Sequence, residues 1–478
     1  MVNETKTLNW DTVFAIPISK VNQYIIDQKS SPARFSFQDN EGNSISGDFK
    51  DWQIKQGGDG SLIWLSLPIK NVSGNSQLLG NYQLESGELI VEVKLRFLDH
   101  TDNENSLQKH LKVRHSSETP EDPVVRQVKF TANVPPSGSS VDIFGDEAAN
   151  AVMSSLIINW LNENLIDFDH VFAIINLNNM IDKDADWAWC TPSYVDYAYS
   201  NGPSEDNSLL GVLCMTGGRQ AGVQQIQQID PFVIPENSEA GFIISKERLL
   251  KDLILPNITS KWKNSQRSDY EVVVGSNPDT GIYQTLLQLK SGKSIRLDQV
   301  KNNGDVYTPY MKNMEISLEG NLIVLNGYTE TKVNSDITAW CKTTHKYTLT
   351  LQNNKNGQSI IYSEYQSPIV IHGTVNNTPV IEKWIETAIG IIAFGILDIL
   401  TDGIAFVASS LLLGLVLGTA DLEPEIIQSL NEDTSPSIDL LSFNATNPIK
   451  WSISEIFKLD IARLNGPFQL GGTLYPSS

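Results

Sequence analysis

The stretches FAIPISKVNQYI (residues 14–25) and FIISKERLLKDLI (residues 242–254) share one pattern, which decides the expected fold. Each begins with an apolar run typical of a strand, passes through Ser-Lys, and continues with apolar residues at helical spacing. Internal similarity of this kind indicates a repeated architecture. We therefore expect two related units, residues 1–235 and residues 236–478.

Each expected unit closes on a long apolar helix. The first helix is predicted over residues 146–165, with one apolar face formed by Met153, Leu156, Ile157, Trp160, Leu161 and Leu165. The second starts at Thr378-Pro379, because proline is favoured at the first helical position, and gives an apolar helical segment over residues 379–420. A break in this segment is expected near Asp402-Gly403.

Most of the remaining sequence alternates apolar and polar residues with a period of two, as strands with one buried face do. This alternation predicts strands at residues 61–69, 89–98, 124–130, 171–175, 209–215, 315–325, 347–351 and 359–370. Helices do not alternate with these strands, so antiparallel meanders are expected rather than parallel units. The expected fold class is α+β.

Composition excludes some classes of partner and compartment. Asp and Glu number 56 against 35 Lys and Arg, for a formal charge of −21. Nucleic-acid binding is therefore not expected, because it requires neutralisation of phosphates by cationic side chains. Three cysteines form no disulfide framework, and we expect three buried, reduced thiols, with a Cys190–Cys214 bridge as the alternative. No secretory signal is recognised at the start, so synthesis in a reducing cytoplasm is expected, with lysis or an unconventional route as the means of release.

Signatures of catalysis are missing from the sequence, which predicts a protein that is not an enzyme and has no cofactor. There is no Gly-x-Ser-x-Gly, no phosphate-binding loop and no dinucleotide-binding glycine pattern. Cys341-x-x-x-His345 offers two metal ligands without a second pair, so no metal site is expected. An aromatic group has two interpretations, a sugar or headgroup site or an ordered loop over a core: Trp187, Trp189, Tyr194, Tyr197 and Tyr199.

Residues 389–420 are the most apolar part of the chain and allow three interpretations. They form a transmembrane helix, a helical hairpin packed inside a sheet, or an exposed apolar tip that enters lipid or a partner. Asp398 and Asp402 interrupt the stretch, which favours the packed hairpin over the spanning helix. The candidate residues for lipid or membrane contact are Ile391, Phe394, Leu397, Phe406, Leu411 and Leu415.

Residues 8–25, 51–69, 190–216 and 242–258 resemble one known family, the forty-seven-kilodalton and OrfX proteins of botulinum-type toxin gene clusters. That family is similar to the tubular lipid-binding (TULIP) superfamily. The resemblance implies duplicated TULIP-like units, each a highly curved antiparallel sheet wrapped around a long helix. An apolar slot between such a sheet and its helix suits acyl chains.

The resemblance implies a function in three alternative forms. The first is a non-enzymatic protein of a bacterial toxin locus, in some relatives an insecticidal one, that binds lipid or another hydrophobic ligand and assists a toxin or OrfX-type partner at membranes. The second is a structural component of a toxin complex with grooves filled by its own side chains. The third is a toxin that inserts residues 389–420 directly into membranes.

Overall fold

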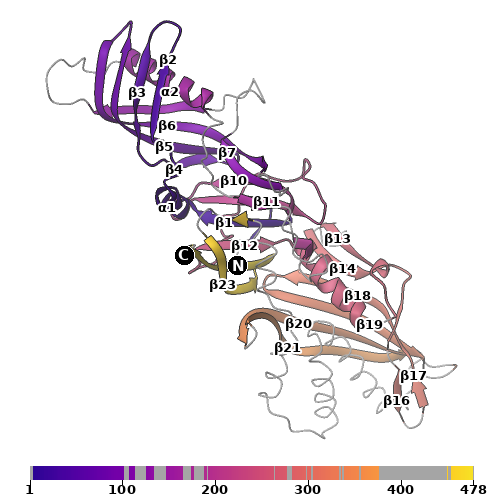
Figure 1. Ribbon diagram of the computed structural model, residues 1–478. Coiled ribbons are helices and arrows are strands. Elements are labelled where there is room, and N and C mark those ends of the chain that lie inside the picture. The colour runs from indigo at the N-terminus through magenta and orange to yellow at the C-terminus, as the bar shows by residue number, and fades with distance from the viewer. Residues whose placement is uncertain are drawn as a thin grey trace. The chain divides into compact units, whose positions relative to one another are not determined.

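A computed structural model of the chain describes most of its 478 residues. The described ranges are residues 4–101, 107–113, 125–133, 147–164, 174–176, 188–190, 192–262, 264–276, 283–297, 299–302, 305–332, 335, 338–354, 357–375, 449–450 and 454–476. Their strands pair mostly in the antiparallel sense and their helices are few (Figure 1). The fold is therefore rich in antiparallel sheet with a small helical part, in agreement with the expected α+β class.

The chain divides into two compact units, each assembled from several segments. Unit 1 contains Met1–Lys6, Ile243–Leu441 and Leu459–Leu470. Unit 2 contains Thr7–Phe242, Ser442–Lys458 and Gly471–Ser478. The prediction that residues 1–235 and 236–478 are two copies of one architecture stays a prediction. Within the described residues, no helix is long and apolar enough to cross a membrane.

The main sheet of unit 2 has the strand order β2-β3-β5-β6-β7-β9-β22, with β4 on β5 and β8 on β6. Its strands are β2 (Arg34–Gln38), β3 (Ser44–Phe49), β4 (Gln53–Asp59), β5 (Leu62–Ser76), β6 (Gly80–Thr101), β7 (Leu107–Val113), β8 (Val125–Asn133), β9 (Ile174–Asn176) and β22 (Ile449–Lys450). Along residues 63–69 of β5 and 89–93 of β6, every second residue is buried, including Ile63, Leu65, Leu89 and Val91. This alternation places one face of the sheet in the core, as the sequence predicted for these parts of residues 61–69 and 89–98.

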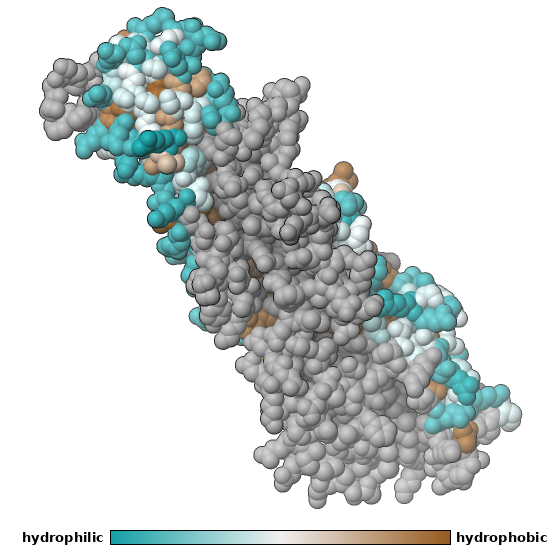
Figure 2. All heavy atoms as spheres, in the orientation of Figure 1, coloured by the Kyte–Doolittle hydropathy of each residue, from teal (hydrophilic) through white to brown (hydrophobic). Residues whose placement is uncertain are grey.

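Helix α2 (Glu147–Glu163) packs against β2, β3 and β8 of this sheet (Figure 1). The apolar face predicted from helical spacing is confirmed for its described residues, because all five are buried: Met153, Leu156, Ile157, Trp160 and Leu161. The sixth predicted residue, Leu165, lies outside the described residues. On the face of the molecule shown in Figure 2, the described residues are mostly hydrophilic with scattered apolar atoms. The core of unit 2 therefore gathers its apolar side chains between α2 and the sheet.

A further sheet has the order β10-β11-β1-β12-β24-β23. Its strands are β10 (Pro192–Ser200), β11 (Leu209–Thr216), β1 (Thr12–Pro17), β12 (Ala240–Ile244), β24 (Phe468–Pro476) and β23 (Ser454–Leu464). Both stretches that share the repeated pattern form a strand followed by a helix. In the first, β1 leads into α1 (Ile18–Gln28), and in the second, β12 leads into α3 (Lys246–Arg248), a π-helical turn (Leu249–Ile254) and α4 (Leu255–Lys261).

Unit 1 contains a sheet of order β13-β14-β18-β19-β20-β21, with β15 paired to β18, and a separate hairpin of β16 and β17. The strands are β13 (Tyr270–Ser276), β14 (Tyr283–Leu289), β15 (Ile295–Arg296), β16 (Val300–Asn302), β17 (Asp305–Tyr307), β18 (Pro309–Glu319), β19 (Leu322–Lys332), β20 (Thr338–Asn354) and β21 (Gly357–Val375). The long strands β20 and β21 curve visibly (Figure 1). The prediction of one strand over residues 315–325 is wrong. Gly320, at φ +61°, turns the chain there and separates β18 from β19.

Residues near the start of the chain belong to unit 1. Glu4 accepts a hydrogen bond from the backbone nitrogen of Gly320 at 2.9 Å and pairs with Lys246 at 2.8 Å. The backbone nitrogen of Thr5 donates to Asn465 O at 3.0 Å, and the Asn465 amide donates to the Thr5 hydroxyl at 2.6 Å. These hydrogen bonds and the ion pair connect the N-terminal segment to the β18–β19 turn, to Lys246 and to the turn that follows β23.

Cys190, Cys214 and Cys341 are buried thiols that form no disulfide. The expectation of reduced thiols is confirmed, and the alternative Cys190–Cys214 bridge is not present. Burial raises the pKa values of Cys214 and Cys341 to about 12, because the thiolate is poorly solvated inside the fold. These two thiols are therefore unreactive at neutral pH.

Candidate functional site

The residues proposed from sequence for lipid or membrane contact lie outside the described residues: Ile391, Phe394, Leu397, Phe406, Leu411 and Leu415. The apolar segment 379–420, the predicted break near Asp402-Gly403 and the three interpretations of residues 389–420 lie outside them too. The remaining candidate positions lie, in each unit, on the sheet face whose side chains are buried, which we call the inner face.

In the described part of unit 2, aromatic side chains pack together between α2 and the sheet. Trp160 of α2 lies against Phe35 and Phe49, with ring centroids 6.1 Å and 5.3 Å apart. Phe49 in turn packs edge-on against Trp52 at 5.3 Å. This aromatic cluster occupies the space between α2 and the strands β2 and β3, where the described side chains leave Trp160 only 8% exposed.

The aromatic group predicted from sequence is divided by the fold, and Trp187 lies outside the described residues. Tyr197 and Tyr199 of β10 are fully buried. The Tyr197 hydroxyl donates to Ser61 O, and the Tyr199 hydroxyl donates to the Asn201 side chain at 3.1 Å. Tyr194 stacks on Trp10 at 6.2 Å. The tyrosines of β10 thus behave as packed and hydrogen-bonded structural residues.

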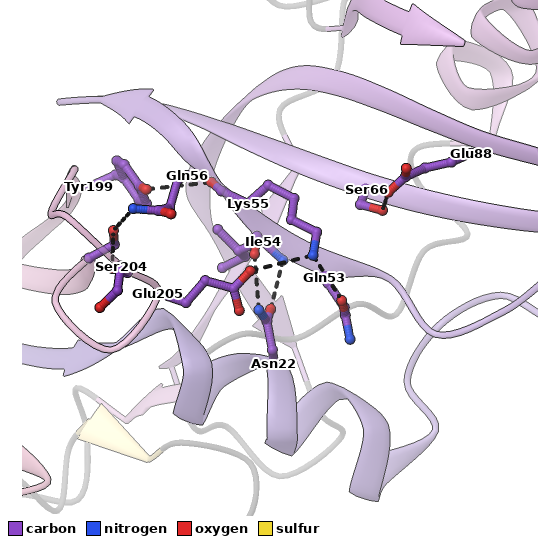
Figure 3. Close-up of polar contacts among 11 residues, drawn as sticks. Asn22, Gln53, Ile54, Lys55, Gln56, Ser66, Glu88, Tyr199, Ser204 and Glu205 are labelled. Carbon is purple, nitrogen blue, oxygen red and sulfur yellow. Dashed lines mark hydrogen bonds and ion pairs between the residues drawn. The ribbon is translucent and has the colours of Figure 1, made fainter. Parts of the chain in front are cut away.

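A polar network in unit 2 joins α1, β4 and the loop of residues 201–208 (Figure 3). The Asn22 side chain bonds both backbone groups of Ile54, donating to its oxygen at 2.9 Å and accepting from its nitrogen at 2.7 Å. Lys55 reaches Glu205 at 3.4 Å, and the Gln56 amide donates to Gly202 O at 2.6 Å.

These contacts pair the polar groups with one another and fix the β4 strand to the loop. The Lys55–Glu205 pair is partly exposed, so its contribution to stability is small. No nucleophile in the network lies beside a base that would activate it. We assign this network a structural role.

The inner face of unit 1 has a different character, which is clearest on β20. Along this strand, buried residues alternate strictly with partly exposed ones. The buried positions are Ala339, Cys341, Thr343, His345, Tyr347 and Leu349. Three of these six side chains carry oxygen or ring nitrogen atoms, although the face belongs to the core. Such polar positions on a buried face require hydrogen-bond partners.

Two of these polar side chains on β20 have atoms without a partner. The Thr343 hydroxyl and the Nε2 atom of His345 are buried and make no hydrogen bond, and the Thr331 hydroxyl on β19 shares this property. Directly across from Thr343 on β19 stands Gly327, which has no side chain, and across from His345 stands Leu325. Neither neighbour can bond these groups, and an unpaired buried polar group typically costs about 1–3 kcal/mol.

His345 is held in the neutral state. Its Nδ1 atom lies 3.2 Å from the Tyr347 hydroxyl, and the two rings are parallel with centroids 6.2 Å apart. Burial lowers the pKa of His345 to about 4, because the imidazolium ion loses its hydration inside the fold. Near pH 7 the ring therefore offers one uncharged nitrogen, Nε2, to whatever lies against this face. We call Thr343 and His345 the β20 polar pair.

Cys341 and His345, which the sequence suggested as two potential metal ligands, share the inner face but do not meet. Four residues along a strand span about 13 Å, whereas in a helix the same spacing would place them side by side. Zinc requires ligand atoms about 2.0–2.3 Å from one ion. Among the described residues, no group of three His, Cys, Asp or Glu side chains is arranged to hold a metal.

The β20 polar pair was not recognised in the sequence, although a signal for it exists. Residues 338–350 read TAWCKTTHKYTLT, in which strict alternation assigns Thr343 and His345 to the same face as Cys341 and Tyr347. The strand was predicted only over residues 347–351, so the polar residues before it were not assigned to a buried face.

Known structures share this arrangement of antiparallel sheets in two units, each of which is built from several segments of the chain. P47 from Clostridium botulinum A2 matches over 98% of each chain, with a TM-score of 0.67 and 18% identity. P47 of Clostridium botulinum E1 also gives a TM-score of 0.67 at 18% identity, over 99% of this chain and 100% of that one. At this level of identity the similarity establishes a shared fold.

The chain belongs to the OrfX-like family, because the family model described as Protein OrfX2/OrfX3/P47 matches residues 7–472. It is 42% identical to Protein OrfX3 of Paraclostridium bifermentans, over 98% of this chain and 99% of the relative. It is 38% identical to Protein OrfX3 of Clostridium botulinum (strain Kyoto / Type A2), with the same coverage. The family resemblance noted from residues 8–25, 51–69, 190–216 and 242–258 is confirmed.

Proposed function

We propose that this protein is a non-enzymatic, TULIP-like protein of two related units that binds a lipid or another apolar ligand in unit 1. We further propose that it assists a toxin or another OrfX-type protein at membranes, and that it acts after release from the cell that makes it. The observation that carries the ligand-binding proposal is the β20 polar pair. Unsatisfied polar atoms on an otherwise apolar inner face have the composition of a lipid site, in which few polar groups orient an apolar ligand.

The apolar part of this face supports the same function. The strands β18 and β19 carry buried aliphatic and sulfur-containing side chains: Met311, Met314, Ile316, Leu318, Ile323 and Leu325. In the described part of unit 2, by contrast, Trp160 packs on Phe35 and Phe49 between α2 and the sheet. We therefore assign the ligand to unit 1.

Acyl-lipid binding is testable on the full chain by native mass spectrometry. The purified protein is analysed as isolated, with its organic extract analysed in parallel, and again after incubation with 1-monooleoylglycerol. We expect a bound mass corresponding to one acyl lipid. Absence of any such mass, both before and after incubation, would overturn the ligand-binding proposal.

An assembly role is the second candidate function, and the filling of unit 2 favours it. A component with self-filled inner faces would retain no lipid and would act through protein contacts alone. The packing of Trp160 on Phe35 and Phe49 supports this candidate. A ligand-free result in the native mass spectrum would favour this candidate.

Support for the membrane role comes from the outer face of unit 1. Ile369 and Ile371 on β21 are 50% and 57% exposed, and Tyr365 on the same strand is 58% exposed. Ile371 stands opposite Lys342, and that ammonium group lies over the Tyr328 ring at 5.9 Å. Exposed aliphatic groups beside tyrosine and lysine are suited to the boundary between lipid and water.

Removing the two exposed isoleucines should weaken membrane contact without affecting the fold. We expect Ile369→Ser/Ile371→Ser to reduce co-sedimentation with phosphatidylcholine vesicles about fivefold or more, because two apolar side chains no longer enter the interface. Val274→Ser is the matched control, because Val274 is a similarly exposed apolar residue on β13. Equal reductions in both variants, or none in either, would contradict a membrane role for β21.

A further inference from the structure

We infer that the ligand of unit 1 is a lipid with an uncharged, hydroxyl-bearing polar group, which the β20 polar pair binds. This inference rests on the proposed function and names the class of ligand. The nearest chemical examples are monoacylglycerols, diacylglycerols and fatty alcohols. This ligand class is supported by the geometry of the pair, by its hydrogen-bonding capacity, by the charge of its surroundings and by the residue that lies across from Thr343 on β19.

The geometry places both groups within reach of one ligand. Thr343 and His345 are two positions apart on β20 and are both buried, so their side chains stand on the same face. Adjacent positions on one face of a strand are about 6.6 Å apart. A glycerol group, which carries oxygen atoms on neighbouring carbons, is able to contact both. Thr331 is four residues along β19 from Gly327, so it is too far away to share that group.

The hydrogen-bonding capacity of the pair matches a hydroxyl group. With Nδ1 of His345 directed at the Tyr347 hydroxyl, Nε2 is the ring atom left for a ligand. Nε2 donates in one tautomer and accepts in the other. A hydroxyl group satisfies either tautomer, because it both donates and accepts, and the Thr343 hydroxyl has the same dual capacity. A quaternary ammonium group would leave both atoms unpaired.

The surroundings offer no compensation for a charged headgroup. The neighbouring described positions of this face on β19 and β20 are Leu325, Gly327, Thr329, Cys341 and Tyr347, and none is charged. A buried phosphate or carboxylate requires a cation or several donors to offset its loss of hydration. An anionic headgroup is therefore disfavoured here.

The residue across from Thr343 on β19 is Gly327. Because glycine has no side chain, β19 supplies no hydrogen-bond partner to the Thr343 hydroxyl from that position. A hydroxyl-bearing ligand would supply the partner that the described neighbours lack.

The test compares lipids that share one acyl chain and differ in their polar group. Delipidated full-length protein is titrated at pH 8 with 1-monooleoylglycerol, oleic acid and oleoyl-lysophosphatidylcholine, and bound fractions are measured by native mass spectrometry. We expect 1-monooleoylglycerol to bind about tenfold more tightly than the two charged lipids. Thr343→Val removes the hydroxyl at nearly constant shape and should weaken monooleoylglycerol binding about fivefold to tenfold.

Two controls separate recognition from folding. Thr344→Val makes the same change one residue along, on the outer face, where the Thr344 hydroxyl bonds Asn326 at 2.8 Å, and it should leave lipid selectivity unchanged. The melting temperature of Thr343→Val should not fall, because the lost hydroxyl is unpaired in the unliganded fold. His345→Leu should show the same loss of selectivity as Thr343→Val.

The outcomes distinguish the inference from the function on which it rests. If all three lipids bind equally and neither Thr343→Val nor His345→Leu changes their binding, the assignment of the polar pair is overturned and the lipid-binding function stands. If no lipid binds at all, the proposed function itself fails. Selectivity lost equally in Thr343→Val and Thr344→Val would also overturn the assignment.

Discussion

Trp160→Ala is expected to lower the free energy of unfolding of unit 2 by about 3–5 kcal/mol, as truncation of a large buried aromatic side chain does. Trp160 is 8% exposed and contacts Phe35 and Phe49 across the interface between α2 and the sheet. Its removal leaves a cavity that the rigid strands β2 and β3 cannot close. The loss should appear as a lower denaturation midpoint at constant slope.

Leu78→Ala is the matched control in the same unit, because Leu78 is 61% exposed. It should change stability by about 0.5 kcal/mol or less, as surface substitutions do. Urea denaturation followed by far-ultraviolet circular dichroism provides the measurement. If Trp160→Ala and Leu78→Ala have the same midpoint, the packing of α2 on its sheet is wrong.

Acidification from pH 7 to pH 4 should cost unit 1 about 3 kcal/mol through His345 alone. The pKa of His345 is lowered by burial to about 4 from its ordinary value of 6.5, and each pH unit of difference corresponds to about 1.4 kcal/mol. Between these two values the unfolded state binds the proton and the folded state does not. The stability is therefore present above pH 6.5 and is lost as the pH falls toward 4.

Hydrogen–deuterium exchange of the β20 amides reports this effect locally. We expect faster exchange at pH 4.5 than at pH 7 in the native protein, after correction for the intrinsic rates. In His345→Leu the difference should be smaller, because leucine has no proton to bind. Carboxylates elsewhere titrate equally in both proteins, so they cancel in the comparison. An identical pH dependence in both proteins would show that His345 does not titrate as its burial requires.

Patterns that depend on local periodicity were predicted from the sequence, and those that depend on register were not. The buried face of α2 follows from the helical spacing of Met153, Ile157 and Trp160, which no tertiary contact alters. The predicted strand over residues 315–325 was wrong because a single turn at Gly320 interrupts an otherwise continuous alternation. The Glu-Gly-Asn sequence at residues 319–321 carried the signal for that turn.

The candidate site depends even more on strand register, which the sequence does not reveal. That Thr343 and His345 are buried follows from alternation along β20, but that they lack partners depends on what stands across the ladder. Gly327 and Leu325 occupy those positions only because β19 and β20 pair in one particular register. Without knowledge of that register, the sequence shows which polar residues share a face of the strand but not which residues lie opposite them. Cys341 and His345 likewise suggested a shared ion only because their conformation was not yet fixed.

Residues 4–6 and 459–470 join residues 243–441 in unit 1, and this arrangement has a consequence for biosynthesis. Glu4 and Thr5 leave the ribosome long before Gly320 and Asn465, the residues that they bind. The 7–242 segment of unit 2 is synthesised between them and has time to fold first. Unit 1 then closes late, when its two outermost segments meet. Chains interrupted before residue 459 would leave the ribosome with unit 1 open and its apolar strands exposed to aggregation.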